Sequence, residues 1–172
     1  MRSIGMVAST ALVAAGTLLG YGAAFPAQAT PEEVALNGTY RATSDGEWAK
    51  LNHQMHGMET VTSIWTVSTT CTSSKECTGQ VSTDQGWSAA IKLNERYWLV
   101  THEVEGWARC SDGTTVAGHR HYKFSQQNRD NIYSKVGVGD LQGYETTLGP
   151  SGGCGNSEWL YVEMPFTLVR IG

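Results

Sequence analysis

The sequence has few charges and no run or stripe of basic residues. Twelve Lys and Arg stand against 16 Asp and Glu, which gives a formal net charge of −4. Nucleic acids and anionic membrane surfaces are bound mainly through clustered Lys and Arg. Neither is therefore an expected partner of this chain. Internal repeats and low-complexity segments are also absent from the sequence.

An apolar run long enough to span a membrane is missing as well. Residues 6–19 are rich in Ala, Leu and Val, but a span requires about 20 such residues. Arg2 precedes this stretch and Ala27-Gln28-Ala29 matches a signal-peptide cleavage site, with no cysteine nearby for a lipid anchor. We expect residues 1–29 to be a signal peptide, with a retained N-terminal anchor as the alternative. Residues 30–35 are expected to be a flexible leader, and 36–172 a single all-β domain.

Cysteine pairs with the spacing C-x-x-C or C-x(2–4)-C do not occur. Their absence argues against thioredoxin-type redox chemistry and against a structural zinc site. The four cysteines are Cys71, Cys77, Cys110 and Cys154. An even number of cysteines in an exported chain predicts two disulfides. Of the three possible connectivities we favour Cys71–Cys77 with Cys110–Cys154, because the short separation of the first pair suits the mouth of a hairpin loop.

Strand signals fill most of the remaining sequence. Residues 60–68 alternate between two faces, and the apolar residues from Leu160 to Leu168 share one face of residues 159–171. Further strands are predicted over 39–43, 79–83, 87–93, 96–104, 114–125, 132–138 and 143–147, whereas 47–58 is either helical or a long loop. Pro165 cannot donate a ladder hydrogen bond, so we expect it at an edge-facing or bulged position.

About eight short strands with turn signals between them, and no helical crossover, predict an all-β fold. We expect a single antiparallel barrel or sandwich with two disulfides, and we prefer the up-and-down arrangement. The arrangement resembles a lipocalin-like barrel in two features: an early Gly-x-Tyr strand, here Gly38-Thr39-Tyr40, and a closing strand that contains Arg170. This likeness concerns the fold and assigns no function.

Segments that could carry catalysis are incomplete. Gly149-Pro150-Ser151-Gly152-Gly153 resembles the G-D-S-G-G segment of chymotrypsin-like proteases, but Pro replaces Asp and His119 lies only 32 positions before Ser151. Glu103 and Glu105 share a strand face, where two carboxylates are more often a solvated rim than a glycosidase pair. We therefore expect a protein that is not an enzyme and that uses no cofactor.

Histidine pairs are the remaining candidates for a metal site. His119 and His121 share one face of a predicted strand, and His53 with His56 could form a second pair. Two imidazoles can bind Zn²⁺ or Cu²⁺ when further ligands complete the set. Spacing alone brings no carboxylate beside them. The alternative is two solvated histidines next to Arg120 and Lys123, and we predict no metal site.

Tryptophan is abundant for a chain of this length. The six residues are Trp48, Trp65, Trp87, Trp98, Trp107 and Trp159. Large aromatic side chains fill cores, and they also line pockets and interfaces. We regard all six as candidate ligand or interface aromatics, with core filling as the alternative.

The pattern W-x-V-x(3)-C-x(5)-C-x-G runs from Trp65 to Gly79. Together with LNGTYRATSDGEWAK, STDQGW and GPSGGCGNSEW…EMPF, it resembles a family of small secreted proteins of mycobacteria and related actinobacteria. Similar modules are appended to actinobacterial membrane proteins, including receptor-like kinases. The resemblance covers most of residues 36–172. It implies secretion and disulfides, and it implies no catalytic residue.

Three functions follow as hypotheses. The first is a secreted, non-enzymatic barrel that binds an apolar small molecule, a cell-envelope component or a protein partner through an aromatic-rich face or mouth. The second is an extracytoplasmic sensory or structural module that acts through protein contacts, either as a monomer or as an oligomer. The third, and the least supported by the residues, is a secreted hydrolase. All three place the protein outside the cytoplasm, in the extracellular space or the cell envelope.

Overall fold

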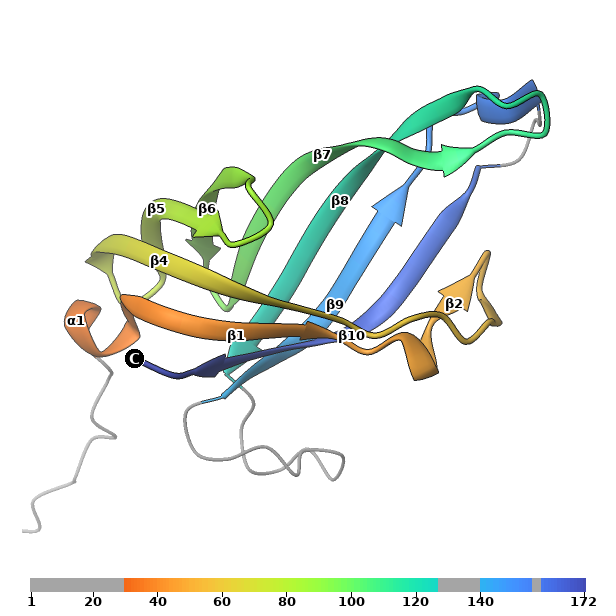
Figure 1. Cartoon of the computed structure of the whole chain (residues 1–172). Helices are drawn as coiled ribbons and strands as arrows, with labels where there is room; N and C mark the ends of the chain where they lie inside the picture. Colours follow the sequence, from red (N-terminus) through yellow and green to blue (C-terminus); the bar gives the residue numbers. More distant parts are fainter. Residues whose placement is uncertain (1–29, 127–139, 156–158) are drawn as a thin grey trace, which may run out of the picture.

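Eight antiparallel strands close into a barrel in the computed structural model, which describes residues 30–126, 140–155 and 159–172 (Figure 1). These strands follow one another around the barrel in chain order, and the last pairs with the first. They are β1 (Gly38–Ser44), β4 (Val61–Ser73), β5 (Glu76–Thr83), β6 (Ser88–Asn94), β7 (Tyr97–Arg109), β8 (Thr115–Gln126), β9 (Leu141–Leu148) and β10 (Tyr161–Arg170). The predicted all-β, up-and-down fold is confirmed, and of the two expected architectures it is the barrel.

The core follows the alternation that the sequence shows. In β4, Ser63, Trp65 and Val67 are buried, while the residues between them are partly or fully exposed. In β10, every second residue from Val162 to Leu168 is buried. Successive side chains of a strand point to opposite faces, so one face of each strand fills the barrel and the other faces solvent.

The connection between β1 and β4 holds three short elements. A 3₁₀ turn, η1 (Gly46–Trp48), is followed by a small hairpin of β2 (Lys50–Leu51) and β3 (Gln54–Met55). β2 pairs with the beginning of β10, beside the part of β10 that pairs with β1. Of the two alternatives for residues 47–58, the helix is therefore wrong: the segment is a 3₁₀ turn and a short hairpin that pairs with β10.

Pro165 lies where β10 changes its partner. β1 pairs with β10 from Phe166 onward, and β2 pairs with it at Val162 and Glu163. The carbonyl of Pro165 accepts a hydrogen bond from the Asp45 amide at 2.8 Å, so its nitrogen also faces this side. The missing N–H therefore falls in the gap between two ladders, as expected for a proline in a barrel strand.

Both favoured disulfides are present. Cys71–Cys77 joins neighbouring strands β4 and β5 near their shared turn. Cys110–Cys154 joins the end of β7 to η2 (Gly153–Gly155), the 3₁₀ turn between β9 and β10. The second bridge ties together the barrel end opposite the C-terminus (Figure 1).

The N-terminal part of the described chain begins with one helical turn. Residues 30–35, predicted to be a flexible leader, contain α1 (Pro31–Val34), which Thr30 caps. Val34 and Leu36 pack against the barrel core. The predicted signal peptide (1–29) and the predicted strand at 132–138 lie outside the described residues. Within them, no helix has the length and apolar character needed to cross a membrane.

Candidate functional site

The barrel interior is divided into layers, and the layer nearest the C-terminus is packed core. Trp65 is fully buried at its centre. Its ring makes edge contacts with Trp87 and Tyr122 and a tilted contact with Phe166, with centroids 4.9–5.4 Å apart. Such aromatic pairs contribute packing energy beyond the area they bury. This layer is filled by side chains, unlike the open interior of a ligand-binding lipocalin.

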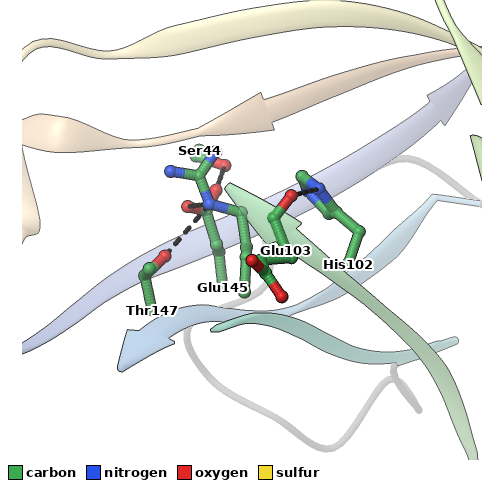
Figure 2. Close-up of polar contacts among 6 residues, drawn as sticks. Ser44, His102, Glu103, Glu145 and Thr147 are labelled. Atoms are coloured by element: carbon green, nitrogen blue, oxygen red, sulfur yellow. Dashed lines mark hydrogen bonds and ion pairs between the residues drawn. The ribbon is translucent and has the colours of Figure 1, made fainter. Parts of the chain in front are cut away.

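A polar layer lies beyond the aromatic core and is built around Arg120 of β8. Figure 2 shows its partners Ser44, Glu145 and Thr147, with their polar contacts dashed. The Arg120 Nε atom is 2.9 Å from Glu145 Oε1, and it donates to Thr147 Oγ1 at 3.0 Å. The Ser44 hydroxyl of β1 donates to the other carboxylate oxygen of Glu145. The side chain of Glu145 is only 5% exposed and that of Arg120 is 18% exposed. Three strands therefore meet through a nearly buried ion pair.

The inward position of these residues follows from the alternation of side chains along each strand, since every second residue faces the same side. Arg120 has the same parity as Tyr122 and Phe124, which are buried in the core. Glu145 has the same parity as Leu141 and Thr147, also buried. A charged residue in the apolar register of a strand was the one signal in the sequence that could have identified this layer. In the sequence, Arg120 stands out only as the neighbour of His119 and His121.

Three flat side chains lie beside this polar layer. Trp87 and His102 stack with centroids 3.9 Å apart and planes 11° from parallel, and the Tyr122 ring is nearly parallel to both. His102 Nδ1 contacts the Glu103 carbonyl oxygen at 3.1 Å. Within the described residues, the buried atoms Trp87 Nε1 and His102 Nε2 have no hydrogen-bond partner. Burial, with the positive charge of Arg120, lowers the pKa of His102 below its usual value, so its neutral form is favoured.

Tyr122 is also held in its neutral form. Burial and the nearby carboxylate of Glu145 raise the pKa of its phenol far above the usual range. Among the described residues of this layer, the opposite charges of Arg120 and Glu145 therefore offset each other. Ser44 faces a carboxylate that is already paired with a guanidinium, and such a carboxylate is a poor general base.

Trp107 closes the interior beyond the polar layer. Its ring leaves no space above Gly118, where an added Cβ would lie 2.7 Å from both Trp107 Cδ2 and Thr147 Cγ2. It packs with a small apolar cluster of Ala49, Leu51, Val162 and Met164. Gly118 and the β2 hairpin thus make room for an indole that seals the polar layer from the end of the barrel.

A pocket of about 590 Å³ lies at this end, on the far side of Trp107. The Cys110–Cys154 disulfide forms part of its wall, and Trp159 at its rim is 53% exposed. Its other lining residues come from the ends of β7 and β8, the β9–β10 connection and the β2 hairpin: Asn52, Ala108, Arg109, Ser111, Val116, Gly149, Pro150, Gly153 and Leu160. We call this the mouth pocket. A smaller hollow beside it shares Asn52 and Trp159 and adds His53, Leu148 and Tyr161.

The six tryptophans have different environments. Trp65 and Trp98 belong to the buried core, and Trp87 and Trp107 are partly buried in the interior layers just described. Trp48 and Trp159 are the exposed pair, at 58% and 53%. Of the six, only Trp159 lines the mouth pocket. The role of these residues in binding stays a prediction, and the structure directs attention to Trp159.

The remaining candidates lie on the outside of the barrel. His119 and His121 are exposed on β8, opposite Glu103 and Thr101 of β7, and His121 Nδ1 is 3.0 Å from the Thr101 hydroxyl. His53 instead lies against the Tyr161 ring. In the part of the chain that the structure describes, no group of three or more His, Cys, Asp or Glu side chains could hold a metal ion. Ser151 lies in an exposed turn at the mouth, and Glu105 is exposed.

Comparison with known proteins identifies a fold relative. No protein-family model and no curated protein matches the chain, so the resemblance to small secreted actinobacterial proteins stays a prediction. Among solved structures, the chain is similar to the monomer form of the M. tuberculosis PknI sensor domain, with a TM-score of 0.56 and 16% sequence identity. The match covers 81% of this chain and 89% of that one. At this identity the similarity shows a shared fold.

Proposed function

We propose that this chain is an extracytoplasmic sensory or interaction module that receives a small, partly apolar ligand in its mouth pocket. The observation that carries the proposal is the mouth pocket itself. Its volume of about 590 Å³ falls in the range typical of ligand sites. Val116, Leu160 and Trp159 offer apolar surface, while Asn52, Arg109 and Ser111 offer a few polar groups.

Two further observations support a sensory role outside the cytoplasm. The similar solved structure is a sensor domain, and the likeness spans most of both chains. The two disulfides suit an oxidising compartment, where such bridges form and persist. The neutralised Ser44–Glu145–Arg120 cluster favours binding over catalysis, because its carboxylate is engaged by a cation. We therefore favour the second hypothesis, a sensory module, over the first, a secreted binding barrel.

A dye titration tests the mouth pocket. The probe is 8-anilinonaphthalene-1-sulfonate, an amphipathic dye whose emission rises in apolar pockets. Trp159→Ala should weaken binding by about tenfold, because a half-exposed indole at a pocket rim is a typical hot-spot residue. Trp48→Ala is the matched control, since Trp48 is as exposed but lies away from the mouth pocket. Equal dye affinity in the two variants would contradict the proposal.

A further inference from the structure

A second hollow, of about 420 Å³, lies on the outer face of the barrel. Its side chains come from five consecutive strands, β6 to β10. Most of them alternate with the buried core residues along their strands and therefore face outward. The residues that define it are Lys92, Thr101, His121, Lys123, Tyr144 and Thr146. We call it the outer hollow. It shares no lining residue with the mouth pocket.

The strand register orders these residues in two rows across the sheet. Lys92 is opposite Leu99, Leu99 is opposite Lys123, and Lys123 is opposite Tyr144. In the next row, Thr101, His121 and Thr146 are consecutive partners. Neighbouring strands are about 4.8 Å apart, so the backbones at the two lysines are about 10 Å apart. The two lysines therefore stand two strands apart in the same row of the sheet.

The outer hollow has a positive charge that contrasts with the acidic chain. The nearest carboxylate in its lining is Glu163, which forms an ion pair with Lys50 at 2.9 Å and accepts a hydrogen bond from the Tyr161 hydroxyl at 2.8 Å. Glu103 lies further along β7, opposite His119. Among the described residues that line the outer hollow, Lys92 and Lys123 therefore carry positive charge that Glu163 does not offset, and His121 lies in the second row between Thr101 and Thr146.

Aromatic rings flank the same lysines. Tyr144 is 53% exposed, so one face of its ring is open to a ligand. Lys123 Nζ lies 4.3 Å from the centroid of the Tyr97 ring, an interaction that holds both side chains in place. An exposed tyrosine ring beside cations and hydroxyls is complementary to a sugar. The C–H face of the sugar ring can pack on Tyr144, and the sugar hydroxyls can form hydrogen bonds with Thr101 and Thr146.

We propose that the outer hollow binds an acidic polysaccharide, with Lys92 and Lys123 on carboxylates of separate sugars and Tyr144, on the strand beyond Lys123, stacked on the next sugar ring. Lysines that stand two strands apart suit charges repeated along a sugar chain better than a single phosphate. A bilayer surface fits less well because it is flat, whereas the site is concave and is lined by hydroxyls and a phenol. This binding is independent of the mouth pocket.

Binding of a galacturonic-acid hexamer by isothermal titration calorimetry tests the proposal, with maltohexaose as the neutral counterpart. The double variant Lys92→Gln/Lys123→Gln should bind the acidic hexamer about tenfold more weakly, which is about 1.4 kcal/mol for the two solvent-exposed charge contacts together. The control Arg41→Gln/Lys75→Gln removes the same charge from exposed positions outside the outer hollow. It should keep the wild-type affinity within about twofold.

Tyr144→Ala provides a second variant that leaves the net charge unchanged, and it should weaken binding by about fivefold through loss of stacking. Trp159→Ala should bind the hexamer like the wild type, because Trp159 lies outside the outer hollow. The hexamer titration therefore tests the outer hollow separately from the mouth pocket. The proposal is overturned if the wild type does not bind the hexamer at millimolar concentration, if maltohexaose binds equally, or if the control variant loses as much affinity as the Lys92/Lys123 variant. Stronger binding to phosphatidylglycerol vesicles than to the hexamer would also overturn it.

Discussion

Replacing Glu145 with Gln is expected to destabilise the barrel by about 3 kcal/mol, because it leaves the Arg120 guanidinium in the interior without a counter-ion. Removing one partner of a buried ion pair costs about 3–5 kcal/mol. Glu145 is 5% exposed, but the 18% exposure of Arg120 lets some water reach the orphaned charge. That partial hydration places the expectation at the lower end of the range.

The pair Lys50–Glu163 is a matched control, because its N–O distance is also 2.9 Å but its side chains are 42% and 22% exposed. Glu163→Gln should cost less than about 1 kcal/mol, as is usual for solvated ion pairs. Urea unfolding with intact disulfides, followed by tryptophan fluorescence and circular dichroism, measures both variants. The double variant Arg120→Met/Glu145→Gln removes both charges and should be more stable than Glu145→Gln alone. If Glu145→Gln loses no more stability than Glu163→Gln, the Arg120–Glu145 pair is not in the nearly buried environment that we assign to it.

Three further changes test other parts of the structure. Loss of the Cys110–Cys154 bridge should lower the unfolding free energy more than loss of Cys71–Cys77, by about 4 against about 2.4 kcal/mol from loop entropy, as measured in urea with paired Cys→Ser variants. Because the pKa of His102 is lowered from 6.5 in the folded state, stability from this residue is complete above pH 6.5 and is lost as the pH falls through the folded value. The melting temperature of His102→Phe, which keeps the stack with Trp87, should therefore fall less between pH 7 and pH 5 than that of the wild type. The same fall in both proteins would rule out a contribution of His102 to the pH dependence of stability. Gly118→Ala should cost about 1–3 kcal/mol by forcing Trp107 and Thr147 apart, whereas Gly57→Ala, which meets only one atom at 4.0 Å, should stay within about 0.5 kcal/mol in the same unfolding assay.

The strands that the sequence predicts well are those in which apolar and polar residues alternate cleanly. Residues 60–68 and 159–171 correspond to most of β4 and to β10, since burial of one face requires this alternation. β9 is longer than its predicted range of 143–147, because Glu145 at an inward position hides the apolar face of that strand. The segment 47–58 is ambiguous because its turn and hairpin are stabilised by contacts with β10, distant in sequence.

The functional features depend on contacts that spacing cannot reveal. Arg120 and Glu145 are 25 positions apart and meet only because β8 and β9 pair in one particular register. The mouth pocket is assembled from the ends of several strands, so no single stretch of sequence indicates it. The tryptophans illustrate the same limit, since Trp65 and Trp159 look alike in composition but lie in the core and at the rim.

Native mass spectrometry of the protein purified from its own host is the decisive test of the proposed ligand at the mouth pocket. We expect an intact mass four hydrogens below that of the reduced chain, together with a non-covalent small molecule that Trp159→Ala loses and Trp48→Ala retains. Four free thiols, or a wild-type protein that carries no ligand or one unaffected by Trp159→Ala, would contradict an oxidised sensory barrel with its ligand at the mouth.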